Sequence, residues 1–222
     1  MITPRLKSIL DIVETKTIAD IGTDHAYIPI RLAEDGRIKK AIACDKNEGP
    51  IKIAKDNIKK YNLEKIIDAR CGDGLKPLFK NEVETIIIAG MGGKLIGNII
   101  EDSLDIAKDS ELILQPMNAQ YELRKRLEEL NFEIVKESLS KEGFKVYNLL
   151  KVRYNSNLTK KNLSEIEYHI PQNLLSHELC PMLIAKKKRE FEKILKGQKS
   201  SYNGDKKLIE YLETMLCQIS KL

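Results

Sequence analysis

The 222-residue sequence contains no tryptophan, and tyrosine and phenylalanine bring its aromatic share to only 5%. Its four cysteines, Cys44, Cys71, Cys180 and Cys217, show no close pairing in the chain. Neither a zinc knuckle nor a disulfide framework is therefore predicted, and we expect reduced thiols at buried or half-buried positions. No apolar run approaches the roughly 20 residues needed to span a bilayer, and no signal-peptide pattern is present. These absences favour a cytoplasmic protein without a membrane or metal association.

Charge is distributed unevenly along the chain. Residues 1–153 hold 26 Lys and Arg against 25 Asp and Glu, whereas residues 154–222 hold 12 against 8. The polar stretch 154–162 lacks periodicity, so we predict a boundary there between domains at 1–153 and 163–222. A basic appendage is compatible with nucleic-acid binding, and a solvated helical face would give the same composition.

The stretch from Thr17 to Pro29 predicts a strand, a tight loop and the start of a helix. Asp24 stands where a dinucleotide-binding loop places its second glycine, and Ala26 stands at the third. A carboxylate there would oppose the two negative charges of a pyrophosphate. S-adenosylmethionine has no phosphate and carries a sulfonium and an ammonium group. The acidic loop therefore favours S-adenosylmethionine as the cofactor and disfavours a dinucleotide.

Hydrophobic patterning predicts that helices and strands alternate along the first domain. The last two strands are expected to pair as an antiparallel hairpin around Gly143. This α/β order is that of a seven-stranded, Rossmann-like class I methyltransferase domain. The expected strands cover 17–22, 41–45, 66–71, 83–89, 111–116, 132–135 and 145–152. Helices are expected over 4–14 and from about 28 to 34, and three more include the apolar residues within 51–61, 95–100 and 123–130.

Polar or glycine-rich turns follow three further strands. Asp45 is expected to accept hydrogen bonds from ribose hydroxyls or to cap the following helix. In Gly72-Asp73-Gly74 the carboxylate can reach an adenine amino group, although a turn built for its backbone alone would have this composition. The glycines of Gly90-Met91-Gly92-Gly93 either let a ligand approach the backbone or form a tight packing turn.

Apolar residues recur at three- and four-residue spacing over 183–195 and 208–219. The spacing predicts two antiparallel helices, a coiled-coil-like hairpin joined by a loop at 197–204.

The polar face of the first of these helices carries Lys186, Lys188 and Arg189, which could bind phosphates or simply be solvated. His169 and His177 do not have the spacing of a ligand pair, and we expect ordinary structural roles for them.

Four motifs stand in order along the chain: Ala19-Asp20-Ile21-Gly22-Thr23-Asp24-His25-Ala26-Tyr27, Gly72-Asp73-Gly74, Ile88-Ala89-Gly90-Met91-Gly92-Gly93 and Leu112-Ile113-Leu114-Gln115-Pro116. Together they resemble the bacterial tRNA (adenine-N1)-methyltransferases that modify adenosine 22. The resemblance covers the whole catalytic domain and the two-helix extension. It departs at one point, because Met117 separates Gln115-Pro116 from Asn118, whereas the family usually has Asn directly after Gln-Pro.

The resemblance implies S-adenosylmethionine as cofactor and tRNA as partner. The oligomeric state is not resolved by the sequence, and a monomer is favoured. It implies Asp24 as the catalytic residue. The residues expected to bind the cofactor are Asp20, Gly22, His25, Asp45, Lys46, Gly72, Asp73, Gly74, Ala89 and Gly90. Those expected to contact the RNA are Tyr27, Met91, Gly92, Gly93, Gln115, Pro116, Asn118, Lys186, Lys188 and Arg189.

The expected chemistry needs no strong base, because the N1 lone pair of neutral adenine attacks the sulfonium methyl group in line. The product ring is cationic, so an acceptor for the exocyclic amino group stabilises charge as it develops. Asp24 can provide it, and its alternative roles are a contact to the cofactor ammonium or an N-cap of the following helix. N1 is occupied in a duplex, so the target base must be unpaired or extruded, and Tyr27 or Met91 are candidates to pack on it.

Two other functions remain open from the sequence. A small-molecule methyltransferase would share the fold, although it would not require the basic helical extension. An RNA-binding protein with a degenerate catalytic domain would not need Asp20, Asp45 and Asp73 together.

Overall fold

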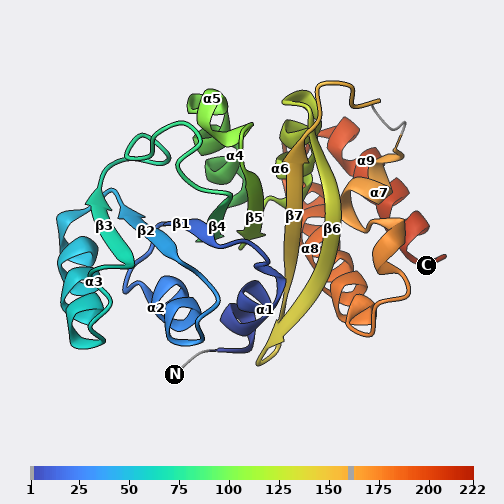
Figure 1. The fold of residues 1–222 in the computed structure, drawn as a ribbon. Coiled ribbons are helices and arrows are strands. Elements are labelled where there is room, and N and C mark those ends of the chain that lie inside the picture. The colour runs from blue at the N-terminus through green and yellow to red at the C-terminus, as the bar shows by residue number, and fades with distance from the viewer. Residues whose placement is uncertain (1–2, 160–162) are drawn as a thin grey trace. The chain divides into compact units, whose positions relative to one another are not determined.

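The computed structural model describes residues 3–159 and 163–222. They fall into two compact units, Met1–Thr159 and Lys160–Leu222, each with an apolar core of its own (Figure 1). We describe the units separately.

The first unit is built on one sheet with the strand order β3-β2-β1-β4-β5-β7-β6. The first five strands are parallel, β7 runs antiparallel to β5, and β6 and β7 form a hairpin. This arrangement confirms the predicted seven-stranded, Rossmann-like α/β fold. The strands are β1 (Thr17–Ile21), β2 (Lys40–Asp45), β3 (Ile67–Cys71), β4 (Thr85–Met91), β5 (Glu111–Pro116), β6 (Phe132–Glu142) and β7 (Lys145–Tyr154).

Helices cover both faces of this sheet. One apolar cluster joins the sheet to α1, α2 and α3, and a second joins it to α4, α6 and the β3–β4 connection. Ile87 of β4 belongs to the first cluster and its neighbours Ile86 and Ile88 to the second, all three with no exposed surface. β4 is therefore buried on both faces, as its continuous apolar run predicts. The helices are α1 (Pro4–Ile12), α2 (Tyr27–Glu34), α3 (Glu48–Lys60), α4 (Gly93–Asp102), α5 (Leu104–Ala107) and α6 (Gln120–Glu129).

Several predicted boundaries in this unit are wrong, including those of β4 and β6. β4 continues through Gly90 and Met91 before α4 begins at Gly93, two residues earlier than expected. β6 extends to Glu142 instead of ending at 135, because every residue from Lys136 to Glu142 has a partner on β7. The turn of this hairpin contains Gly143 at φ +59°, which fits its predicted place.

The second unit contains the predicted antiparallel pair, α8 and α9, which pack on each other through Phe191, Leu212 and Met215. The predicted loop at 197–204 is too long, because α8 continues to Ser200. A short helix, α7, precedes the pair and was not predicted. The elements are α7 (Glu165–His169), the 3₁₀ turn η1 (Gln172–Leu174), α8 (Cys180–Ser200) and α9 (Lys206–Ile219).

Buried side chains in this unit include His169, whose Nε2 lies 2.8 Å from the Tyr211 hydroxyl and whose ring meets Phe191 edge-on. It has the structural role expected of it. Cys44 and Cys180 are buried as predicted, but Cys71 and Cys217 are exposed, and all four are free thiols. Among the described residues, no helix is both long and apolar enough to cross a membrane.

Candidate functional site

The predicted motifs of the first unit meet at the carboxyl edge of the parallel strands. The chain builds β2 and β3 on one side of β1 and places β4 and β5 on the other, so the strand order reverses between β1 and β4. Ligands of open α/β sheets bind outside the strand ends at such a reversal. Gly22 follows β1, and Gly90 lies near the end of β4, on either side of this point.

Gly22 and Met91 bring these two loops into contact. Gly22 has φ +74°, and its N–H donates to the Cys44 carbonyl over 2.8 Å. A Cβ atom on Gly22 would overlap the Met91 Cε methyl, which lies against the glycine backbone. The missing side chain therefore lets the fourth-strand loop close onto the first.

Asp20 is a buried acid next to this contact, with 5% of its surface exposed. Its Oδ2 accepts a 2.7 Å hydrogen bond from the Thr23 hydroxyl. Burial raises the pKa of Asp20 to about 6, the Thr23 hydrogen bond opposes that rise, and the negative charge of Asp45 adds to it. A buried carboxylate with a shifted pKa in a loop of this kind is suited to a cationic ligand group.

Asp24 stands in the same loop but faces solvent, with 72% of its side chain exposed. Its backbone has φ +42°, an uncommon conformation for a residue with a side chain. Asp24 Oδ2 lies 3.3 Å from His25 Nε2, and the His25 ring stacks on Tyr27 with centroids 5.1 Å apart. The N-cap of α2 is Ala26, in the left-handed conformation, so the N-cap alternative for Asp24 is wrong. Its carboxylate is left available to a ligand.

Asp45 ends β2, and its Oδ1 accepts a 2.8 Å hydrogen bond from the Asn47 N–H. Asn47 is the N-cap of α3, so the cap alternative for Asp45 is wrong as well. The Gly72 N–H donates to the Asp45 carbonyl over 2.9 Å, which ties the ends of β2 and β3 together. Lys46 is exposed beside them, and its carbonyl lies 3.6 Å from Cys71 Sγ.

The turn Gly72-Asp73-Gly74 opens the β3–β4 connection. A Cβ on Gly72 would overlap the Pro77 ring, and Gly74 has φ +57°, so both glycines are needed for this path. The Asp73 side chain is 67% exposed and pairs with Lys76 over 3.3 Å. The turn thus places the Asp73 carboxylate at the end of β3, and its backbone path requires glycine on both sides of that residue.

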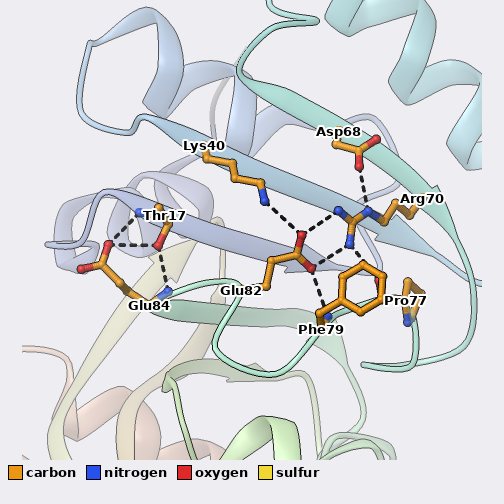
Figure 2. Close-up of polar contacts among 8 residues, drawn as sticks. All are labelled: Thr17, Lys40, Asp68, Arg70, Pro77, Phe79, Glu82 and Glu84. Atoms are coloured by element: carbon orange, nitrogen blue, oxygen red, sulfur yellow. Dashed lines mark hydrogen bonds and ion pairs between the residues drawn. The ribbon is translucent and has the colours of Figure 1, made fainter.

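Arg70 holds this connection against the sheet and was missed by the sequence prediction (Figure 2). Its guanidinium makes two 2.8 Å hydrogen bonds to Glu82, one of 2.9 Å to the Pro77 carbonyl and one of 2.7 Å to Asp68. Glu82 also accepts from Lys40 Nζ over 3.0 Å. The Arg70 hydrogen bonds lower the pKa of Glu82 to about 2. The β3–β4 connection contains no helix, and the bidentate Arg70–Glu82 pair ties its two ends together.

On the other side of the reversal, Gln115 of β5 organises the fourth-strand loop. It is 1% exposed, and its Oε1 accepts from the Gly90 N–H over 3.2 Å and from Arg5 Nη1 over 2.8 Å. Its Nε2 donates to the carbonyl of Pro116, the last residue of β5. Arg5 comes from α1 and was not predicted, because no local signal links residues so far apart in the chain.

Asn118 lies over the glycines of the same loop. Its Oδ1 is 3.0 Å from where a Cβ on Gly92 would stand, and the Gly93 N–H donates to the Asn118 carbonyl over 3.0 Å. An added Cβ on Gly93 would overlap the Ala119 carbonyl. The residue inserted at Met117 therefore leaves an amide beside the glycines, and Ala89 is partly buried behind them.

Three predicted RNA contacts lie in the second unit, on α8. Lys188 and Arg189 are exposed, and Arg189 Nε donates to the Ala185 carbonyl over 3.1 Å. Lys186 is partly buried, and burial lowers its pKa. Their role remains a prediction about this unit alone. Within 3–159 and 163–222, no group of three His, Cys, Asp or Glu side chains could hold a metal ion.

The acids and glycines brought together by the first unit suit a cationic nucleoside-like ligand. Carboxylates at the ends of β1, β2 and β3 can accept hydrogen bonds from ammonium, hydroxyl and amino groups, and the glycine backbones let a ligand approach closely. An anionic pyrophosphate would meet repulsion from the same carboxylates.

Comparison with known proteins shows consistent similarity. Residues 2–150 match the model of a family described as a methyltransferase domain. Over 148 residues, the chain is 36% identical to the tRNA (adenine(22)-N(1))-methyltransferase of Bacillus subtilis strain 168. That alignment covers 66% of this chain and 62% of the Bacillus enzyme, so the chain spans less than two thirds of that protein.

Several solved structures match the chain along its length, and two of them were solved with a ligand. Streptococcus pneumoniae Sp1610, provisionally named a tRNA (m1A22) methyltransferase and solved with S-adenosyl-L-methionine, has a TM-score of 0.85 and 33% identity, covering 100% of this chain and 99% of that one. TrmK of M. capricolum, solved with S-adenosyl-homocysteine, has a TM-score of 0.81 and 26% identity, covering 98% and 95%.

Proposed function

The chain belongs to the methyltransferase-domain family and, within it, to the tRNA (adenine(22)-N1)-methyltransferases, and we propose that it methylates N1 of adenosine 22 in tRNA with S-adenosylmethionine. The observation that carries the proposal is the exposed Asp24 carboxylate beside the contact between Gly22 and Met91. The names of the relatives support the substrate, and the acidic strand ends support the cofactor.

The cofactor site is proposed at the ends of β1 to β4. Asp45 accepts from the ribose hydroxyls, Asp73 accepts from the adenine amino group, and Asp20 faces the ammonium. Gly22 and Gly90 admit the ligand close to their backbones. When bound, S-adenosylmethionine supplies a methyl group on a sulfonium, and that sulfur keeps the electron pair of the bond that breaks.

Asp24 is proposed to act on the target base. Its carboxylate accepts a hydrogen bond from the exocyclic amino group, which positions N1 and stabilises the positive charge that the ring gains. His25, 3.3 Å from the carboxylate and stacked on Tyr27, holds Asp24 in place. Met91 closes the opposite side of the loop pair, where an extruded base can pack.

The second unit is proposed to bind the body of the tRNA. Lys188 and Arg189 are exposed on α8 and suit contacts to the phosphates of an RNA double helix. Proteins recognise such a double helix by its shape more than by its sequence. A tRNA substrate also supports the expected cytoplasmic location, and we retain a monomer as the working state.

The test is methyl transfer from labelled S-adenosylmethionine to unmodified bulk tRNA, with nucleoside analysis of the product. We expect 1-methyladenosine with the wild type. Asp24→Ala should lower kcat by roughly a hundredfold and leave the cofactor Kd within about twofold, because the carboxylate acts on the base. Asp35→Ala, which removes an acid at the far end of α2, is the matched control and should keep full activity.

Three outcomes would contradict the proposal. Cofactor binding without transfer to any tRNA would favour the small-molecule alternative. Binding of tRNA without cofactor binding would favour a degenerate, non-catalytic protein. An Asp24→Ala variant that loses cofactor affinity but keeps kcat would assign this carboxylate to the ammonium.

A further inference from the structure

The turn between β6 and β7 presents a fully exposed aromatic side chain. This hairpin tip comprises residues 141–145, and Phe144 within it is 99% exposed. The turn itself needs only Gly143, whose φ of +59° permits the reversal. Folding gives no reason for a large apolar ring at the next position, because the ring packs on nothing. A single exposed apolar side chain is common on protein surfaces, so the case for a partner depends on the ring together with its charged neighbours and its place in the fold.

The hairpin tip lies at the same sheet edge as the proposed site. Leu114 of β5 pairs with Leu150 of β7, so the residues of β7 before Asn148 and their partners on β6 extend past Pro116, where β5 ends. Figure 1 shows the β6–β7 hairpin continuing well beyond the end of β5. The carboxyl ends of the parallel strands point in this direction, and so does the tip.

Arg5 anchors the hairpin tip to the loop that is proposed to receive the base. Its Nε lies 3.4 Å from Glu142 Oε2, and its Nη1 donates to Gln115 Oε1, the oxygen that also binds the Gly90 N–H. The Arg5 guanidinium also lies over the Tyr147 ring, 5.9 Å from its centroid. Phe144 lies two residues after Glu142 in the hairpin tip. The contacts of Arg5 therefore fix the position of the hairpin tip relative to Gly90.

The charges of the hairpin tip fit an anionic partner. Lys141 and Lys145 are exposed on either side of the turn. Glu142 pairs with Arg5, so the only acid of the tip does not offset these two lysines. An exposed ring between two cations is the combination that binds unpaired nucleotides, since bases stack on the ring and phosphates meet the lysines. A second copy of the chain would bring the same positive charges face to face.

We propose that the hairpin tip is an RNA contact, in which Phe144 stacks on an unpaired base near the methylated adenosine and Lys141 and Lys145 bind the adjoining phosphates. This inference rests on the proposed function and adds to it a substrate contact that lies outside the predicted site. It also explains why the tip is aromatic and basic at a position where the fold requires only a turn.

The test compares Phe144→Ala, Phe144→Trp and Tyr61→Ala, with tRNA and S-adenosylmethionine as ligands. Tyr61, 45% exposed, follows α3 at the opposite edge of the sheet and serves as the matched aromatic control. Phe144→Ala should raise the Kd and KM for tRNA by about 5- to 100-fold and leave the cofactor Kd unchanged. Phe144→Trp should keep a tRNA affinity close to that of the wild type, and Tyr61→Ala should have the same tRNA affinity as the wild type. Because the Phe144 ring packs on nothing, Phe144→Ala should leave the free energy of unfolding unchanged, and urea unfolding checks this.

Several results would overturn the inference. Equal tRNA Kd and KM for Phe144→Ala and the wild type would show that the ring makes no RNA contact. A loss of dimer on gel filtration in Phe144→Ala, with tRNA affinity kept, would assign the tip to a contact between chains. A wild type that binds tRNA and the cofactor without transfer would refute the proposed function, and the tRNA Kd of the variants would still decide the inference.

Discussion

Asp20→Asn is the substitution that best tests the electrostatics of the site. Asp20 is buried, and its pKa rises from the ordinary 3.8 to about 6 because burial disfavours the charged form. An acid whose pKa is raised on folding contributes stability fully below its unfolded pKa and loses that contribution as the pH rises through its folded pKa. The contribution of Asp20 is therefore present below pH 3.8 and lost by about pH 7.

The magnitude follows from the shift. About two pKa units at 1.36 kcal/mol each correspond to roughly 3 kcal/mol of stability lost between pH 4 and pH 8. The asparagine carbonyl of Asp20→Asn can still accept from the Thr23 hydroxyl, and the side chain never ionises. Its extra N–H groups cost about 1–3 kcal/mol if they are left without acceptors. The variant should thus be less stable than the wild type at pH 4 and as stable or more stable at pH 8.

Urea unfolding of both proteins at half-unit steps from pH 4 to pH 8 measures this difference in stability. Cofactor titration at pH 8 measures whether the Asp20 carboxylate also contributes to cofactor affinity. We expect the stability difference to change by about 2–3 kcal/mol over this range and the cofactor affinity of the variant to fall. Asp56→Asn, which changes an exposed acid of α3, is the control and should keep the wild-type pH dependence and cofactor affinity. Parallel stability curves for Asp20→Asn and the wild type would refute the reasoning.

Two further substitutions test the loops around the site. Glu82→Gln should cost roughly 2–3 kcal/mol at pH 7, because the lowered pKa of Glu82 means stability that is present above pH 4.5 and lost as the pH falls through about 2. Urea unfolding at pH 7 and pH 3.5 should show that this cost shrinks at the lower pH, with Glu64→Gln, a change at an exposed acid, as the control; a cost independent of pH would contradict this. Gly93→Ala should destabilise by roughly 2–4 kcal/mol, since its Cβ would overlap a backbone carbonyl, whereas Gly197→Ala meets nothing within 4 Å and should cost nothing in the same urea assay.

The elements that sequence patterns predict well are those whose pattern is local. The apolar run 83–89 and the acids at the ends of β1 and β2 lie where the patterns place them. Boundaries set by pairing with distant residues are missed. β4 extends to Met91 because Met91 pairs with Pro116 after a register shift, and β6 reaches Glu142 because β7 offers it a partner throughout.

The site shows the same division. Its acids and glycines could be predicted because the topology brings strand ends together, whatever the details of each loop. The left-handed backbone at Asp24 and Ala26 could not, since such conformations are rare outside glycine. Arg5 and Arg70 carry no local signal, because their partners Gln115 and Glu82 are recognisable only once the sheet has formed.

The way Arg5 is held fits the charge that the proposed reaction creates. The adenine ring becomes cationic as N1 is methylated, so an unpaired cation beside it would oppose the reaction. Arg5 lies next to the fourth-strand loop, but Glu142 balances its charge and its Nη1 donates to the Gln115 oxygen that also accepts from the Gly90 N–H. Asp24, on the other side of the loop pair, leaves its carboxylate exposed. The fold thus neutralises the cation that orders the loop and leaves the Asp24 carboxylate available to the base.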